Sequence, residues 1–435
     1  MKKNRTIYFL LALVCLGLQS CLFQEEDYFD DSSANRATAD VKRCSELLEA
    51  APNGWVMEYY VGKDYSLGGI TLLCKFDGQR VTMASQIAGA DETVSSLYSV
   101  KSEQATMLSF DTYNYLVHYF GQPQGSMADD PNGTLGGDYE FVISDATADR
   151  IELKGKKYGN RIVMKAFSAD QTWKQYLTRI KKVEDDAFFY EYDLRMDGLY
   201  TGQMLRSNYT FIVTYYDEVG KVHQKTVPFM FTTDGMRFHE PVTIDGQTMQ
   251  NFVWKNEEIS FVCTDEGATG VKMKGIYIDG YQSYDYYPGT YLMDFYRLNG
   301  ATNQLEVASQ EIQLVKDEDG KSYWLKGLEY DILVTYDKPR GGLSILPQFL
   351  KKVQGGYVYL AMWDLMNDYV LRSSAIGLIS YPTTDGIYLV DNGVWMGEIS
   401  GFIFGVYDSQ DEEASFMGYT DAVAAIRLIK KTIEE

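Results

Sequence analysis

Short segments with the pattern of β-strands recur along this 435-residue chain and constrain its fold more than any other feature. Residues 69–76 and 80–87 are two such segments, and Asp77-Gly78 between them is a typical hairpin turn. Similar segments, bounded by Gly, Asp or Ser, continue to residue 407 without regular alternation with helices. This order argues against a parallel α/β sheet. It predicts a mainly β chain of antiparallel sandwich or barrel-like domains with a few short helices.

A few segments have the 3.6-residue spacing of apolar positions that is typical of amphipathic helices. We predict helices over residues 35–51, 112–120, 169–183 and 421–433. The third begins with a capping-box pattern, Ser168 followed by Gln171. Residues 75–81 and 232–238 also resemble each other, and both halves of the chain end in a predicted helix. Duplication and the chance recurrence of similar hairpins both account for this pattern.

The N-terminus has the composition of a secretory signal peptide. Lys2, Lys3 and Arg5 precede a short apolar run over residues 7–18, which is too short for a comfortable membrane span. The following Ser20-Cys21 resembles the lipobox of bacterial lipoproteins, which implies lipidation of Cys21. An ordinary signal peptide with an incidental cysteine is the alternative.

An acidic segment follows the predicted lipidation site. Glu25, Glu26, Asp27, Asp30 and Asp31 resemble the surface-export signal of Bacteroidetes lipoproteins, although a solvated spacer has the same residues. We therefore expect a signal peptide over 1–20 and a lipidated acidic tether over 21–34. A β-rich domain with flanking helices follows over 35–185. A second β-rich region covers 186–435 and divides into 186–270 and 271–435 if it holds two modules.

The charge balance excludes one large class of function. The formal charge is −21, and removal of residues 1–20 takes away three basic residues and no acidic one, which leaves −24. Nucleic-acid binding needs clustered Lys and Arg to neutralise phosphates, so nucleic acid is not an expected partner. An acidic surface also repels anionic lipid, so membrane attachment depends on the lipid at Cys21.

The cysteines and histidines give no sign of a metal or a catalytic centre. Cys44, Cys74 and Cys263 each lie on an apolar face, which favours buried thiols over a disulfide or a metal site. His118, His223 and His239 lack the spacing of metal ligands. The sequence contains no G-x-S-x-G, H-E-x-x-H or C-x-x-C. We therefore expect neither a cofactor nor a metal, although a triad assembled from distant residues stays open.

Several motifs together resemble an uncharacterised family of Bacteroidetes surface lipoproteins, a domain-of-unknown-function family. Besides the lipobox and the acidic tether, they are residues 51–55 (APNGW), 108–114 (LSFDTYN), 137–141 (GDYEF) and 153–157 (LKGKK). The resemblance implies a location near outer-membrane nutrient-uptake systems of the starch-utilisation type. It supplies no catalytic residue.

The densest group of aromatic residues lies at 281–291. Clustered flat rings beside an Asp stack on sugar faces and bond hydroxyl groups, or form a protein interface, or simply cover the edge of a sheet. The candidate ligand-binding residues are Tyr281, Tyr284, Asp285, Tyr286, Tyr287 and Tyr291.

Three functions are compatible with these features. The first is a non-catalytic, lipid-anchored protein of the outer-membrane surface that binds a ligand or glycan for a nutrient-uptake system, with transporter components or glycans as partners. The second is a glycoside hydrolase with paired carboxylates, because 61 acidic residues leave room for such a pair. The third is a structural or adhesive envelope protein.

Overall fold

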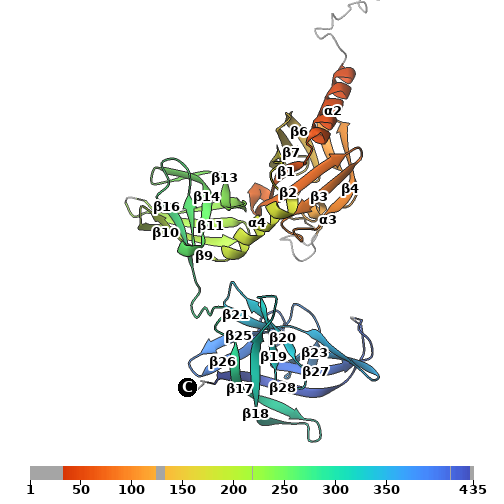
Figure 1. The fold of residues 1–435 in the computed structure, drawn as a ribbon, viewed down its shortest axis with the longest axis vertical. Helices are drawn as coiled ribbons and strands as arrows, with labels where there is room; N and C mark the ends of the chain where they lie inside the picture. Colours follow the sequence, from red (N-terminus) through yellow and green to blue (C-terminus); the bar gives the residue numbers. More distant parts are fainter. Residues whose placement is uncertain (1–32, 124–132, 218, 412, 432–435) are drawn as a thin grey trace, which may run out of the picture. The chain divides into compact units, whose positions relative to one another are not determined.

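The computed structural model describes residues 33–123, 133–217, 219–411 and 413–431. The predicted signal peptide, Cys21 and most of the acidic tether lie outside these ranges. The described residues form two compact units, those up to 187 together with 194–274, and 188–193 together with those from 275 onwards. Three antiparallel β-structures follow one another along the chain (Figure 1), which confirms the predicted mainly β, barrel-like fold. No helix of the described ranges is long and apolar enough to cross a membrane.

The first β-structure is a closed barrel in which each strand pairs with the next and β8 pairs with β1. Its strands are β1 (Trp55–Val61), β2 (Gly68–Asp77), β3 (Arg80–Ser85), β4 (Val94–Ser102), β5 (Thr106–Phe110), β6 (Glu140–Ala146), β7 (Arg150–Gly155) and β8 (Arg161–Ala166). Along β1, Trp55, Met57 and Tyr59 point into the core, whereas Glu58 lies on the outer face. The outer face of the barrel is therefore where polar side chains of several strands gather.

Helix α2 (Ser33–Ala50) anchors the start of the first unit to the barrel core. Cys44 and Leu48 on one face of α2 belong to the same buried cluster as Trp55 and Leu72. The indole of Trp55 donates a hydrogen bond of 2.8 Å to the carbonyl of Leu48. The predicted helix over 35–51 is thus confirmed. The segment predicted as a helix over 112–120 contains only the short α3 (Tyr115–His118).

The second β-structure is also a closed barrel and completes the first unit except for a few residues of its end strands. It comprises β9 (Glu191–Met196), β10 (Leu199–Ser207), β11 (Thr210–Tyr216), β12 (Val222–Phe231), β13 (Gly235–Ile244), β14 (Gln247–Lys255), β15 (Ser260–Cys263) and β16 (Val271–Ile276). Phenylalanine rings fill its interior, among them Phe211, Phe229 and Phe238, all of which are buried.

Helix α4 (Trp173–Asp186) connects the two barrels along the chain and packs on the outer face of the first. Its Leu177 lies in a buried cluster with Leu73 and Ala84 of β2 and β3. The predicted helix is confirmed, but the predicted capping box is wrong. Thr172 and Gln175 form the capping box, not Ser168 and Gln171, because the helix starts four residues later.

The third β-structure forms most of the second unit. Its strands are β17 (Gly289–Asn299), β18 (Gln304–Lys316), β19 (Ser322–Lys326), β20 (Ile332–Asp337), β21 (Gly342–Ile345), β22 (Gln348–Val353), β23 (Gly356–Asp364), β24 (Tyr369–Leu371), β25 (Leu378–Thr383), β26 (Gly386–Asp391), β27 (Gly401–Tyr407) and β28 (Phe416–Lys430). Strands β17 to β21, β25, β26 and β28 pair in this order, and β28 also pairs with β17. These strands therefore close a ring, from which β27, β23 and β22 extend.

The predicted helix over 421–433 is wrong, because these residues belong largely to strand β28. Ala424, Ile426 and Leu428 are buried at every second position, which is the period of a strand. The sequence has apolar residues at spacings of both two and three. Pairing of β28 with β17, β26 and β27 selects the strand. The two halves of the chain therefore do not both end in a helix, which removes one argument for duplication.

Candidate functional site

The predicted tyrosine cluster at 281–291 belongs largely to the core of the second unit. Tyr287 and Tyr291 are fully buried. Their hydroxyl groups donate to the carbonyls of Gly341 at 2.8 Å and Tyr287 at 2.7 Å. A stacking role would need surface that these two rings do not expose. They instead belong to the buried core cluster of the second unit.

The other members of the cluster are more accessible. Tyr284 is half-buried, stacks on Tyr323 with ring centroids 4.7 Å apart, and donates to the carbonyl of Ser322 at 2.8 Å. The half-buried Tyr281 accepts a hydrogen bond of 3.1 Å from Tyr336. Tyr286 is 39% exposed, and the exposed Asp285 pairs with Lys316. A ligand role for this segment stays a prediction that rests mainly on Tyr286 and Asp285.

Two hollows elsewhere in the described residues have the volume of a small-ligand site. The first, here called the charged groove, has a volume of about 600 Å³ and lies in the first unit. The outer faces of β1, β6, β7 and β8 form one side of it, and β13 of the second barrel forms the other. Its lining residues are Glu58, Tyr60, Tyr65, Ser144, Arg150, Glu152, Leu153, Lys154, Arg161, Ile162, Val163, Arg237, His239 and Glu240.

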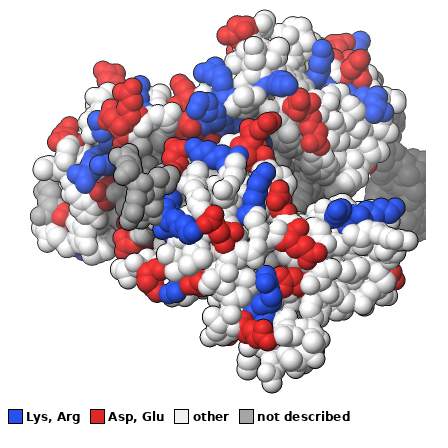
Figure 2. All heavy atoms as spheres, turned by 60° about the horizontal axis from the view of Figure 1, so that its bottom comes forward, with Lys and Arg blue, Asp and Glu red and all other residues white. Residues whose placement is uncertain are grey.

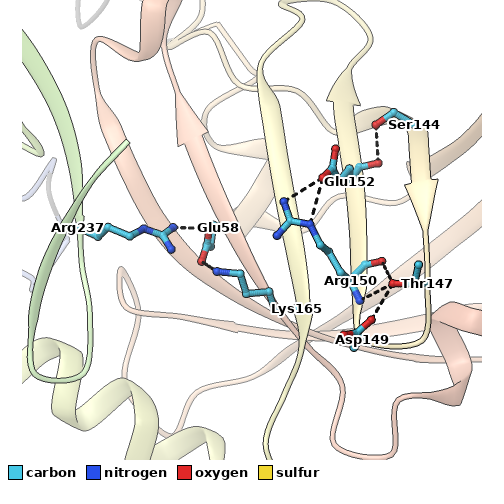
Figure 3. A network of polar contacts seen from close by, with 8 residues as sticks. All are labelled: Glu58, Ser144, Thr147, Asp149, Arg150, Glu152, Lys165 and Arg237. Carbon is cyan, nitrogen blue, oxygen red and sulfur yellow. Dashed lines mark hydrogen bonds and ion pairs between the residues drawn. The ribbon is translucent and has the colours of Figure 1, made fainter. Parts of the chain in front are cut away.

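Among the lining residues of the charged groove, the carboxylate of Glu58 has two cationic partners. Arg237 reaches from β13 to one carboxylate oxygen, and the ammonium of Lys165 lies 2.7 Å from the other (Figure 3). Burial acts to raise the pKa of Glu58, but the two cations outweigh this effect, so that the pKa lies below its usual value. Glu58 is therefore ionised at neutral pH and fully occupied by its partners.

Charged residues alternate with buried ones along β7. Arg150 and Glu152 form an ion pair of 3.0 Å on the outer face (Figure 3). Ile151 and Leu153 between and after them are buried. Lys154 continues the outer row and lies directly opposite Arg161 of β8. Neither Lys154 nor Arg161 makes a side-chain ion pair with any residue of the described ranges.

An aromatic corner closes the end of the charged groove next to β13. The imidazole of His239 packs against the rings of Tyr60 and Tyr65, with centroids 4.3 and 4.1 Å away. Burial lowers the pKa of His239, so the ring is neutral at pH 7. Tyr60 is only 3% exposed, and its hydroxyl lies beside the guanidinium of Arg237 without an acceptor for its own proton among the described residues.

The second hollow, here called the aromatic cleft, has a volume of about 500 Å³ and lies in the second unit. Phe349 of β22 is 44% exposed there, and its ring meets Tyr359 of β23 at 5.4 Å. The guanidinium of Arg372 lies 4.8 Å from the ring of Tyr359 and 4.3 Å from that of Tyr407. A hydrogen bond to the carbonyl of Asp411 holds this guanidinium in place.

Neutral polar side chains complete the aromatic cleft. Gln348, Ser373, Ser374 and Gln410 line it beside the rings. The amide of Gln348 is held by bonds to the backbone of Leu333, at 2.8 and 2.9 Å. Amides and hydroxyls both donate and accept hydrogen bonds, as a sugar hydroxyl does. Rings and neutral polar groups in one cleft suit a ligand with apolar faces and many hydroxyls.

The cysteines and histidines take structural positions. Cys44, Cys74 and Cys263 are buried free thiols, as predicted. His223 pairs with Asp217 at 2.9 Å, and His118 lies at the end of α3. Within the described ranges no three His, Cys, Asp or Glu residues are placed to hold a metal ion. On the face drawn in Figure 2, basic and acidic side chains are interspersed and form no continuous basic area.

Neither hollow was identified from the sequence. The charged groove brings β1 and β13 next to the consecutive strands β6, β7 and β8, and the aromatic cleft brings residues 372–374 and Gln410 next to the hairpin of β22 and β23. One signal was available for the groove. Arg150, Glu152 and Lys154 occupy every second position of a predicted strand, which indicates a charged outer face.

Comparison with known proteins gives families but no function. Residues 25–256 match a family of domains of unknown function, DUF4302, and residues 264–403 match a second one, DUF4987. No curated protein matches the chain.

Two solved structures show weak likeness. One is a protein of unknown function of the DUF3598 family from Nostoc punctiforme PCC 73102. It has 8% identity and a TM-score of 0.15 over 57% of this chain and 98% of its own. The other is intact Ap-TbpB with its N and C lobes, with 11% identity and a TM-score of 0.14 over 84% of this chain and 67% of its own. Such TM-scores support no structural argument.

The predicted resemblance to an uncharacterised family is thus confirmed at this coarser level. Because the first match covers more than half of the residues, the chain belongs to the DUF4302 family of domains of unknown function.

Proposed function

We propose that this protein is a lipid-anchored, non-catalytic glycan-binding accessory of an outer-membrane nutrient-uptake system, and that the aromatic cleft of the second unit holds the glycan. The observation that carries the proposal is the combination of exposed Phe349 with Tyr359, Arg372 and neutral amides in one cleft of about 500 Å³. The lipobox-like Ser20-Cys21 and the acidic residues after it support the location.

The rings in the cleft suit sugar binding because they are held in place before a ligand arrives. Tyr359 packs between Phe349 and Tyr407, with centroid distances of 5.4 and 5.8 Å. Arg372 covers two of these rings, which fixes their orientation. A ligand that binds a preformed surface loses less conformational entropy than one that must order it.

The protonation and ion pairing of two carboxylates in the charged groove favour binding over hydrolysis as the function. A glycoside hydrolase needs one carboxyl group whose pKa is raised, so that it donates a proton at neutral pH. The pKa of Glu58 is instead lowered, and Glu152 is paired with Arg150. Neither Glu58 nor Glu152 therefore supports the hydrolase alternative.

The proposal is tested with the full mature chain in detergent by affinity electrophoresis in gels that contain amylopectin, xylan, β-glucan or galactomannan. We expect retardation by at least one of these neutral glycans. Phe349→Ala removes a ring of the cleft and is expected to weaken this binding about tenfold, which corresponds to about 1.4 kcal/mol.

Tyr381→Ala serves as the matched control, because Tyr381 is 62% exposed in the same unit but does not line the cleft. Retardation by none of the glycans contradicts the proposal. Equal effects of the two substitutions would move the binding surface away from the cleft.

A further inference from the structure

We propose that the charged groove of the first unit is a second ligand site, and that Lys154 and Arg161 bind the carboxylate or sulfate group of an acidic saccharide there. The saccharide part of this inference rests on the proposed function. The anionic part rests on the charges of the groove alone.

The carboxylates of the groove are largely neutralised within the protein. Glu58 binds both Arg237 and Lys165, and Glu152 binds Arg150. Glu240 is the remaining carboxylate among the lining residues. Neither Lys154 nor Arg161 forms an ion pair with Glu240 or with any other residue in the described part of the chain.

The positions of Lys154 and Arg161 bring two positive charges together, which is unfavourable unless an anion binds between them. They face each other in direct register across β7 and β8, where like charges destabilise a strand pair. Both side chains are exposed, so water reduces the cost. An anion between them would convert the repulsion into two attractive contacts. The planar guanidinium of Arg161 can donate hydrogen bonds to two oxygens of such an anion at once, and the ammonium of Lys154 attracts it as a point charge.

A buried hydroxyl whose proton has no acceptor lines the same groove. The hydroxyl of Tyr60, a residue that is only 3% exposed, lies beside the guanidinium of Arg237 but finds no acceptor for its own proton in the described part of the chain. Buried hydroxyls normally donate their proton as well as accept one, so this exception points to a missing acceptor. The neighbouring Tyr65 and His239 add ring surface against which a pyranose can pack.

The volume of the groove and the net charge of the protein limit which ligands can bind there. A groove of about 600 Å³ lies within the range of small-ligand sites. The formal charge of −21 repels polyanions at long range. Binding of an acidic saccharide thus depends on the positive charges of Lys154 and Arg161. Removal of both charges is therefore expected to abolish or strongly weaken this binding.

The test uses the full mature chain in detergent and isothermal titration with three probes. Oligogalacturonate carries carboxylates, sulfated dextran carries sulfates, and plain dextran carries neither. We expect binding of at least one acidic probe and a loss of about tenfold or more in the double variant Lys154→Gln/Arg161→Gln. The probe that binds distinguishes carboxylate from sulfate as the recognised group.

Lys221→Gln/Lys225→Gln is the matched control, because it removes the same charge from exposed positions outside the groove. Equal loss in both double variants would overturn the site, as would the absence of binding to both acidic probes. The outcome is separable from the proposed function. Loss of neutral-glycan binding in Phe349→Ala concerns the aromatic cleft and leaves the charged groove unaffected.

Discussion

Arg237 of the second barrel donates to the carboxylate of Glu58 on the first barrel, so one ion pair joins two β-structures within the first unit. The side chain of Glu58 is 13% exposed and that of Arg237 is 23% exposed. Lys165 adds a second contact to the same carboxylate at 2.7 Å. This arrangement makes Glu58 the most informative position for testing how the barrels hold together.

Glu58→Gln is expected to lower the free energy of unfolding of the first unit by about 3 kcal/mol, because a partly buried guanidinium loses its counter-charge. Denaturant titration monitored by tryptophan fluorescence measures the effect. Glu46→Gln is the control, since Glu46 forms an exposed ion pair of 3.8 Å with Lys42 and is expected to cost less than about 1 kcal/mol. Similar losses in the two variants would show that the ion pair does not stabilise the unit.

The same carboxylate is expected to make stability depend on pH. The pKa of Glu58 is lower in the folded chain than its ordinary value of 4.5. Its contribution is therefore complete above about pH 4.5 and is lost as the pH falls through the lower folded pKa. We expect the free energy of unfolding to fall less steeply in Glu58→Gln than in the wild type between roughly pH 5 and pH 3. The same pH dependence of the free energy of unfolding in both proteins would contradict a lowered pKa of Glu58.

Tyr60→Phe is expected to change the free energy of unfolding by less than about 1 kcal/mol, because the deleted hydroxyl finds no acceptor among the described residues and only faces the guanidinium of Arg237, which Glu58 already binds. The neighbouring Tyr59 is the matched control. Its buried hydroxyl donates to the carbonyl of Asp138 at 2.8 Å, so Tyr59→Phe is expected to cost about 1 kcal/mol. Thermal unfolding of both variants gives the comparison, and an equal loss in each would assign Tyr60 a protein partner.

Cys21→Ala is expected to release the protein from the membrane, because acyl chains on Cys21 would be its anchor. Fractionation of cells and metabolic labelling with palmitate measure the two effects. Cys15→Ala is a suitable control, because it changes a cysteine inside the predicted signal peptide. Membrane retention and labelling of Cys21→Ala would refute lipidation at this residue.

The pattern of alternating residues was enough to predict the class of fold. Hairpins such as that at Asp77-Gly78 are local, so their residues alone indicate strands on either side. Short strands such as β21 and β24 were missed, because three or four residues carry too little periodicity. Strand β28 was predicted as a helix, because the spacing of its apolar residues does not reveal that three other strands pair with it.

The candidate site was less accessible from the sequence. The tyrosines at 281–291 are conspicuous in the chain, but burial of Tyr287 and Tyr291 depends on how β17 packs over distant strands. The opposition of Lys154 and Arg161 depends on strand register, and the proximity of Glu58 and Arg237 depends on the packing of two barrels. Such relationships are long-range, and a single sequence does not contain them explicitly.

The ring of the second unit has a consequence for biosynthesis. The first barrel closes when β8 meets β1, before the second barrel has been made. The later ring closes only when β28 reaches β17, and β28 also completes the edges of β26 and β27. The edge of β17 therefore remains unpaired on that side while all intervening strands are synthesised, and such edges recruit other chains. A nascent chain is thus most exposed to misassembly in its last third, where protection by a holding chaperone would matter most.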